Sequence, residues 1–343
     1  MRALVKEKPQ PGLSLLEIEK PQVENVDDVQ FNVAHCGICV GETKVYDWGE
    51  WAIADPTIKL PTVLGHEVSG VVTEVGSGVR RFKPSDRITV DVNIHCGQCY
   101  QCREGHNNMC VEREIYGKRR GAFAEYAVLP ERVICRLPDK TSLEEGALME
   151  NLGVAVHAVE HTEHDTGDLA VVIGCGPIGI MAAQTLTAYG VKVVSTDMVE
   201  SRLRVAEEIS GGTVINIKNE DPVKKIKEMT DGKGADFVLE AAATQSAIDQ
   251  AFDIIRDRGT IVTIGTFDRP VTFNPFFKMT RREIRLVSSI GRTWKTWRKV
   301  VQLINSDRFN LRPLITQILP MEKYEEGFEL AKSPNAMKVL LRP

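Results

Sequence analysis

A glycine-rich turn between an apolar stretch and a helical pattern constrains the fold of this chain more than any other feature. Residues 169–173 are apolar and lead into Gly-Cys-Gly-Pro-Ile-Gly, which begins at Gly174. A helical pattern follows over residues 178–189. Further apolar strands are expected at 191–196, 235–240, 260–264 and 284–290. Strands that alternate with helices predict a parallel sheet covered on both faces, the doubly wound α/β arrangement.

The spacing of these glycines indicates a dinucleotide site. The pattern G-x-G-x-x-G is weak alone, but here it follows a strand and opens a helix, as a dinucleotide fold requires. Gly174 permits the tight turn, Gly176 lets the backbone approach the pyrophosphate, and Gly179 allows close helix packing. Asp197 ends the next predicted strand, and its carboxylate can accept hydrogen bonds from the adenosine ribose. The 2′-phosphate of NADP would meet a like charge at Asp197, so we expect NAD. The alternative to a dinucleotide site is an ordinary strand–helix turn.

The residues before this region have a different hydrophobic pattern. Val29, Phe31 and Val33 alternate with polar residues, and short apolar stretches at 68–75 and 121–129 lie between turn signals. This pattern predicts a compact, mostly antiparallel β domain. The C-terminal segment is expected to return to this β domain, with a helix near 294–305 and a strand near 339–341. The domains predicted are 1–149 with both zinc sites, 150–290 for NAD, and 291–343 as the C-terminal return.

Four cysteines close together predict a structural zinc site. Cys96, Cys99, Cys102 and Cys110 lie within 15 residues. Soft sulfur ligands that fill a tetrahedron suit zinc and leave no position for water or substrate. An iron–sulfur cluster, disulfides or a DNA-binding zinc ribbon are the alternatives. We expect the metal to stabilise a lobe too small to fold by itself.

Composition narrows the possible partners. The 43 basic and 47 acidic residues give a formal net charge of -4, which does not favour a nucleic acid. No run of about 18 apolar residues predicts a membrane span, and the first ten residues lack the apolar stretch of a secretion signal. We therefore expect a cytoplasmic protein with reduced thiols, no membrane and no nucleic-acid partner.

A second, open zinc site is indicated further upstream. Gly65-His66-Glu67 follows Cys39 by a few tens of residues, and Cys39, His66 and an acid could form such a site. An open site keeps one position for a substrate oxygen, and zinc there acts as a Lewis acid on an alcohol.

The chain resembles the zinc-dependent medium-chain alcohol dehydrogenases over its whole length. The Gly-His-Glu segment, the four-cysteine lobe and the Gly-Cys-Gly-Pro-Ile-Gly turn occur in the family's order. The resemblance implies a GroES-like catalytic domain beside a Rossmann domain. It assigns Cys39, His66 and Glu67 to the catalytic zinc, completed by Glu150 of Met-Glu-Asn-Leu-Gly.

Within the family the chain is most similar to the L-threonine 3-dehydrogenase and sorbitol dehydrogenase group. The segment Tyr-Asp-Trp-Gly-Glu-Trp, from Tyr46, and the later Gly-Arg-x3-Thr-Trp, from Gly291, carry this similarity. The resemblance implies a homotetramer. It implies cofactor contacts at Ile178, Asp197, Arg202, Ile264, Gly265 and Thr266.

The sequence departs from the group beside the catalytic zinc. Family members carry Thr or Ser two residues after the zinc cysteine and His three further on, which relay the alcohol proton to solvent. Here these positions are Gly41 and Lys44. Either water fills the space or Lys44 takes part, as a proton shuttle or by holding an anionic group of the substrate. The basic run Lys118-Arg119-Arg120 could also bind an anionic substrate, although a solvated turn is the simpler interpretation.

These patterns predict an NAD-dependent enzyme that oxidises a small secondary alcohol, with L-threonine or a similar 2-amino-3-hydroxy compound as the first candidate. A polyol or sugar-alcohol dehydrogenase, or a dehydrogenase of an anionic hydroxy compound, is the second. A zinc and nucleotide binder without activity is the third.

Overall fold

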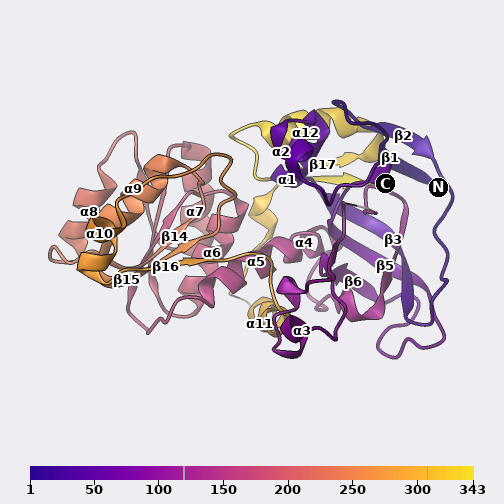
Figure 1. The fold of residues 1–343 in the computed structure, drawn as a ribbon, viewed down its shortest axis with the longest axis horizontal. Coiled ribbons are helices and arrows are strands. Elements are labelled where there is room, and N and C mark those ends of the chain that lie inside the picture. Colours follow the sequence, from indigo (N-terminus) through magenta and orange to yellow (C-terminus); the bar gives the residue numbers. More distant parts are fainter. Residues whose placement is uncertain (119, 307) are drawn as a thin grey trace. The chain divides into compact units, whose positions relative to one another are not determined.

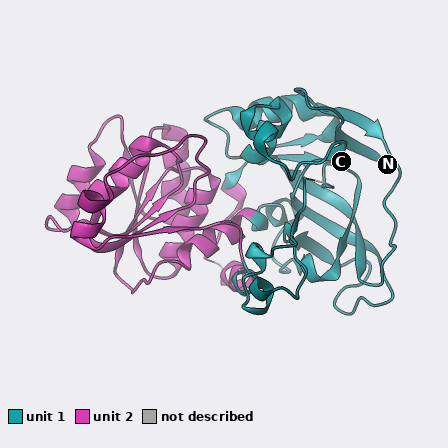
Figure 2. Ribbon diagram, in the orientation of Figure 1, with its two compact units in different colours: residues 1–150, 293–297, 314–343 teal, residues 151–292, 298–313 magenta. Residues whose placement is uncertain are grey.

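The computed structural model describes residues 1–118, 120–306 and 308–343, which form two compact units (Figures 1 and 2). Unit 1 comprises residues 1–150, 293–297 and 314–343. Unit 2 comprises residues 151–292 and 298–313. The nucleotide-type unit thus interrupts the sequence of the other.

Unit 2 is built on a six-stranded parallel sheet. Its strand order is β13-β12-β11-β14-β15-β16, so the direction of winding reverses between β11 and β14. This order is that of the Rossmann fold, in which ligands bind at the carboxyl ends of the strands at the reversal. The doubly wound fold predicted from the sequence is confirmed. The strands are β11 (Leu169–Ile173), β12 (Lys192–Asp197), β13 (Thr213–Asn216), β14 (Ala235–Glu240), β15 (Ile255–Thr263) and β16 (Arg285–Ser288).

Helices cover this sheet, which explains why its central strand β11 is apolar throughout. All five residues of β11 are buried. A strand covered on both faces needs no polar side, so the sequence shows a continuous apolar run. The helices are α5 (Met149–Val159), α6 (Pro177–Ala188), α7 (Glu200–Ser210), α8 (Pro222–Met229), α9 (Gln245–Ile254) and α10 (Pro275–Lys278).

One strand of this sheet begins earlier than its sequence indicates. A strand is expected from residue 260, but β15 begins at Ile255, which pairs with Ala235 before a register shift. Arg258 lies inside the strand with a positive φ of 61°. The residues around this irregularity are polar, so the beginning of the strand cannot be recognised from its hydrophobicity pattern.

Unit 1 is a mostly antiparallel β structure. Its larger sheet has the order β10-β6-β5-β3-β18-β17, and β9 also pairs with β3. The long strand β3 (Asp28–Gly37) pairs antiparallel with β5 (Glu67–Val75), β9 (Tyr126–Pro130) and β18 (Lys338–Arg342). The predicted strand at 121–129 is therefore shorter, because β9 begins only at Tyr126.

The remaining elements of unit 1 surround this sheet. A second sheet joins β1 (Arg2–Lys6), β2 (Ser14–Glu17) and β4 (Thr62–Val63), and a small one joins β7 (Asn93–Ile94) and β8 (Glu114–Ile115). The last strands are β6 (Arg87–Val90), β10 (Ile134–Arg136) and β17 (Ile315–Pro320). The helices are α1 (Val40–Asp47), α2 (Glu50–Ala54), α3 (Tyr100–Arg103), α4 (Leu143–Gly146) and α12 (Tyr324–Lys332). Helix α4 opens with the expected capping box, in which the Ser142 side chain accepts from the backbone N–H of Glu145.

The C-terminal return is divided, in contrast to the single segment 291–343 expected from the sequence. Residues 293–297 and 314–343 group with unit 1, whereas 298–313 group with unit 2. Helix α11 (Trp294–Asn305) begins in the former and continues in the latter. Asn310 exchanges hydrogen bonds with the Gln184 side chain on α6, and this docking holds the intervening stretch in unit 2.

The start of α11 is anchored within unit 1 by a buried polar network. The indole N–H of Trp297 donates to the carboxylate of Asp91, at 2.9 Å, and the backbone N–H of Trp294 donates to the Asn107 side chain. Asp91 has no exposed surface. Buried polar groups of this kind are stable only when paired, so the network fixes where the chain re-enters unit 1.

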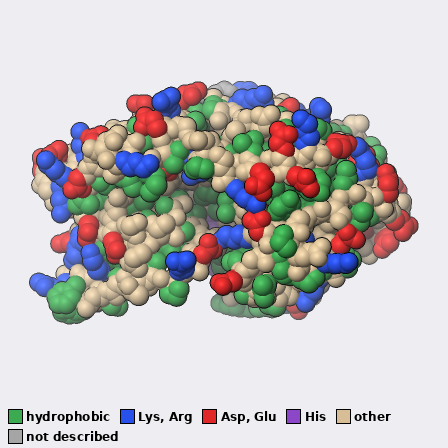
Figure 3. Space-filling model, turned by 90° about the horizontal axis from the view of Figure 1, so that it is seen from above, with side chains coloured by type: hydrophobic (Ala, Val, Ile, Leu, Met, Phe, Trp, Pro, Cys, Tyr) green, Lys and Arg blue, Asp and Glu red, His purple; other side chains and the backbone are tan. Residues whose placement is uncertain are grey.

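The described chain has no helix long and apolar enough to cross a membrane. On the face drawn in Figure 3, acidic and basic side chains are interspersed. This mixed surface agrees with the small net charge of -4.

Candidate active site and cofactor site

Cys39, His66 and Glu67 lie together in unit 1. Their ligand atoms are all within 4.8 Å of one another. Cys39 is the N-cap of α1 just after β3, and Glu67 begins β5. The antiparallel register pairs Gly37 with Glu67, which brings the ends of the two strands together. The chemistry of this donor set, one thiolate, one imidazole and one carboxylate, fits an open zinc site.

Glu42 is a fourth member of this site that the sequence analysis missed. Its Oε1 lies 2.9 Å from Nδ1 of His66, and its Oε2 accepts from the backbone N–H of Cys39 at 2.9 Å. A carboxylate on one ring nitrogen fixes the tautomer and leaves the other nitrogen for a metal. Burial alone would lower the pKa of His66, but Glu42 and the Cys39 sulfur raise it well above its usual value.

Lys338 is the second residue that the sequence did not reveal. Its ammonium forms an ion pair with Glu67, and both side chains are almost completely buried. Lys338 lies on β18, near the end of the chain, so only the sheet brings it to Glu67. Burial opposes the charge, yet Glu67 raises the pKa of Lys338 above its usual value. The pair therefore holds one oxygen of Glu67 away from solvent.

Glu150 lies outside the three-residue group formed by the described residues, at the beginning of α5 and only 4% exposed. Its charge is nonetheless close enough to raise the pKa of Lys338. Lys44 is half-buried on α1, with its ammonium 5.6 Å from the ring centroid of Trp51. Beside Gly41, a side chain would meet only the Cys39 sulfur, at 3.9 Å. Space is therefore available there for water.

The four remaining predicted ligands form a closed cluster. The sulfurs of Cys96, Cys99, Cys102 and Cys110 lie within 4.8 Å of one another. The sulfur atoms of Cys110 and Cys96 are 3.5 Å apart, and backbone N–H groups of Cys96 and Cys99 point at sulfurs of the cluster. Four converging sulfurs that accept N–H groups fit a tetrahedral zinc with no open position.

In unit 2, the glycine turn has the geometry that its sequence predicts. Gly174 has a φ of 99°, a conformation that other residues rarely adopt. A side chain at Gly179 would overlap the carbonyl oxygen of Gly174, so only glycine lets α6 approach β11 so closely. Gly176 is the N-cap of α6, and nothing lies within 4 Å of where its side chain would be. The helix N-terminus is thus open to an anion such as a pyrophosphate.

The carboxylate of Asp197 is held in place by three backbone N–H groups. Its Oδ2 accepts from Cys175 at 2.7 Å, and its Oδ1 accepts from Met198 and Val199. The first of these bonds connects the end of β12 directly to the glycine turn. Arg202 is half-buried on α7, and its Nε is buried without a hydrogen-bond partner within the described chain.

Three further predicted cofactor residues, Ile264, Gly265 and Thr266, follow β15 beside the carboxyl end of β14. The N–H groups of Ile264 and Gly265 both donate to the carbonyl of Glu240, and Thr266 follows them. Ile178 is in the first turn of α6. Glu240, which the sequence analysis did not single out, is fully buried and accepts from the N–H groups of Ala242 and Ala243. Burial raises the pKa of this carboxyl, although the two bonds lower it in part.

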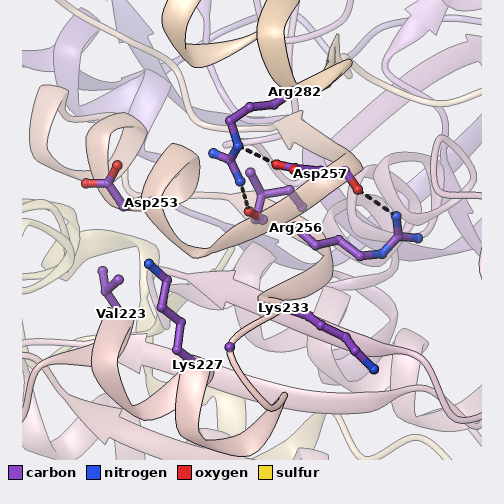
Figure 4. Close-up of a pocket in the computed structure, with 9 residues that line it drawn as sticks. Val223, Lys227, Lys233, Asp253, Arg256, Asp257 and Arg282 are labelled. Carbon is purple, nitrogen blue, oxygen red and sulfur yellow. Dashed lines mark hydrogen bonds and ion pairs between the residues drawn. The ribbon is translucent and has the colours of Figure 1, made fainter.

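A cavity of about 700 Å³ in unit 2 lies elsewhere (Figure 4). Its lining includes Lys227 of α8, Lys233 just before β14 and Arg256 at the amino end of β15. The cofactor turn follows the carboxyl end of β11, whereas this cavity lies at the opposite edge of the sheet. Figure 4 shows Arg282 bonded to Asp257, so part of its charge is already satisfied.

Comparisons with known proteins identify the family of this chain. Residues 25–139 match the model of the alcohol dehydrogenase GroES-like domain, and residues 177–306 match that of the zinc-binding dehydrogenases. L-threonine 3-dehydrogenase of Bacillus subtilis (strain 168) is 35% identical over 346 residues, which cover 100% of this chain and 99% of that protein. The chain belongs to the zinc-dependent alcohol dehydrogenases.

Other members of the family act on different alcohols. Sorbitol dehydrogenase of Halalkalibacterium halodurans is 33% identical, over 100% of this chain and 99% of that protein. The structure of 2R,3R-butanediol dehydrogenase from Bacillus subtilis superposes with a TM-score of 0.88 at 29% identity, covering 100% of this chain and 99% of that one. The chain is thus an NAD-dependent alcohol dehydrogenase. Its two donor sets fit two zinc ions, one at an open site and one at a closed site.

Proposed function

We propose that this alcohol dehydrogenase oxidises a small secondary alcohol, with L-threonine or a similar 2-amino-3-hydroxy compound as the first candidate. The cluster of Cys39, His66 and Glu67 is the observation that carries this proposal, because it leaves a position for a substrate oxygen. The likeness to L-threonine 3-dehydrogenases supports the choice of substrate.

The residues of the chain have distinct roles in this proposal. Cys39, His66 and Glu67 hold the catalytic zinc, and Glu150 completes its surroundings. A zinc ion held there would supply a Lewis acid that lowers the pKa of the alcohol, and bound NAD would supply the hydride acceptor. Glu42 orients His66 through Nδ1, and the open space beside Gly41 lets water carry the alcohol proton away.

The cofactor roles follow the glycine turn. Gly174, Gly176 and Gly179 shape the backbone for the pyrophosphate, and Asp197 accepts hydrogen bonds from the adenosine ribose. Within the described chain, Arg202 has a buried nitrogen without a hydrogen-bond partner, and both Arg202 and Asp197 act electrostatically on Cys175 of the glycine turn, which favours a role for Arg202 at the adenosine end. We also assign cofactor contacts to Ile178, Ile264, Gly265 and Thr266.

A polyol or sugar-alcohol dehydrogenase is the second candidate, supported by the likeness to sorbitol dehydrogenase. The test is NADH formation with L-threonine, sorbitol and butane-2,3-diol under the same conditions. We expect the highest kcat/KM with L-threonine. A higher value with sorbitol would select the second candidate, and no turnover of any alcohol would refute both.

We further propose a homotetramer in the cytoplasm, as the resemblance to the family implies. Light scattering of the purified chain tests the first point: a mass of about one chain, near 38.1 kDa, would refute it.

A further inference from the structure

Two lysines of unit 1 share one aromatic ring, that of Trp51. The ammonium of Lys44 lies 5.6 Å from the ring centroid of Trp51, and that of Lys118 lies 5.5 Å from the same centroid. They come from separate elements, since Lys44 is on α1, Trp51 is on α2, and Lys118 follows β8. An aromatic face attracts cations, so it lowers the free-energy cost of placing two ammonium groups near each other.

Both lysines lie on segments that contact the metal ligand His66. On α1, Glu42 lies 2.9 Å from Nδ1 of His66 and two residues before Lys44. On the other segment, Gly117 immediately precedes Lys118, and a side chain at Gly117 would come within 3.1 Å of His66. Both cations are therefore carried by segments that contact His66.

Asp55 holds Lys118 in place, and Lys118 keeps donors for another anion. Lys118 forms an ion pair with Asp55, whose side chain is 13% exposed. Burial raises the pKa of Asp55, but hydrogen bonds from Lys118 and Thr57 outweigh it and hold the pKa below its usual value. The Asp55 carboxyl is thus ionised at neutral pH. An ammonium has three donors, so one carboxylate leaves donors for a second anion.

We infer that Lys44 and Lys118 determine substrate specificity by binding an anionic group, a carboxylate or a phosphate, carried by the alcohol. This inference rests on the proposed dehydrogenase function and narrows its substrate class. L-threonine satisfies it through its carboxylate, whereas sorbitol and butane-2,3-diol do not. The neighbouring Arg119 lies outside the described residues, and Arg120 is paired with Glu114.

The test compares substrates that differ only in the charged group. One pair is 3-hydroxybutyrate and butan-2-ol, and the other is sorbitol 6-phosphate and sorbitol. The measured quantity is the ratio of kcat/KM for the anionic member to that for the neutral member. In the unmodified enzyme we expect this ratio to exceed one for at least one pair, and the better pair identifies carboxylate or phosphate as the group. A ratio below one for both pairs would overturn the inference.

Variants assign the effect to the two lysines. Lys44→Met and Lys118→Met should each lower the ratio by about tenfold or more, mainly through KM of the anionic substrate, as expected for the loss of a charge-assisted hydrogen bond. Lys44→Arg should restore much of it. Lys332→Met is a matched control, because Lys332 also lies over an aromatic ring, Tyr46, and pairs with Asp47. Its ratio should equal that of the unmodified enzyme.

Other outcomes separate the alternatives. If Lys44→Met slows both members of each pair alike and alters the pH profile of kcat, Lys44 relays the proton and the inference is wrong. If the unmodified chain turns over no alcohol, the proposed function fails, and the inference is decided by tryptophan fluorescence titration with the same two pairs of compounds. Equal affinity for the anionic and neutral members of both pairs, or no binding of any of the four, would then refute it.

Discussion

Replacing Glu42 should weaken zinc binding at the proposed catalytic site without removing any ligand. Glu42 orients two ligands at once, through 2.9 Å contacts from its separate oxygens to Nδ1 of His66 and to the N–H of Cys39. Loss of such an outer partner typically costs about 10- to 100-fold in metal affinity. Glu42→Gln can retain one of the two bonds, so we expect about tenfold. Glu42→Ala loses both, so we expect about 100-fold, or roughly 2.7 kcal/mol.

The pH dependence of this loss gives a sharper test. Zinc binds the neutral imidazole, so protons compete with zinc below the pKa of His66. Glu42 raises that pKa, which means that it favours the proton as well as the metal. Removal of Glu42 lowers the pKa and weakens proton competition. The loss of affinity in Glu42→Gln should therefore be largest at alkaline pH and should shrink as the pH falls through the raised pKa.

The assay is chelator competition across a pH series, with Cys39→Ser as the baseline that retains only the closed site. Glu131→Gln is the matched control, because Glu131 also accepts backbone N–H groups, from Arg80 and Arg81, and is not part of the zinc cluster. Unchanged zinc affinity in Glu42→Ala would refute the orienting role. A loss that is the same at every pH would refute the argument about the pKa of His66.

Three further predictions concern other parts of the chain. Cys39→Ser should abolish activity and remove one of two zinc ions. Cys99→Ser should instead make the four-cysteine lobe more sensitive to proteolysis. Metal analysis that finds one zinc per chain in both the parent and Cys39→Ser would contradict this. Asp197→Ala should weaken NAD binding and raise the relative kcat/KM with NADP, and equal use of both cofactors by the parent would disprove the reasoning. Lys338→Met should lower the free energy of unfolding by about 3–5 kcal/mol, because a buried carboxylate loses its partner. Denaturation of the double variant with Glu67→Gln should show partial recovery, and an equally unstable double variant would argue against the ion pair.

Much of the fold and part of the sites could be predicted because the relevant residues are close in sequence. A strand, a turn and a helix follow one another around Gly174, so their spacing alone predicts the nucleotide unit. The four cysteines of the closed site lie on one short lobe, and their spacing indicates a metal for the same reason. Hydrophobic periodicity placed the buried strands, although it missed the polar beginning of β15.

Contacts between distant segments had no such signal. Lys338 reaches Glu67 only because β18 pairs with β3, which in turn pairs with β5. An aspartate and a tryptophan about 200 positions apart, Asp91 and Trp297, are joined by a hydrogen bond that no local pattern announces. The division of α11 between the two units likewise depends on what each half contacts.

The sequence by itself determined the class of fold, the two sets of metal donors and the glycine turn, because each is encoded by residue types at short, fixed spacing. The tertiary structure decided which charged groups surround those donors: Glu42 on His66, Lys338 on Glu67, and Lys44 with Lys118 on one ring. The physical reason is that electrostatic partners are chosen by proximity in space. Proximity between segments far apart in the chain is set by strand pairing and packing, which the spacing of residues along the chain does not record.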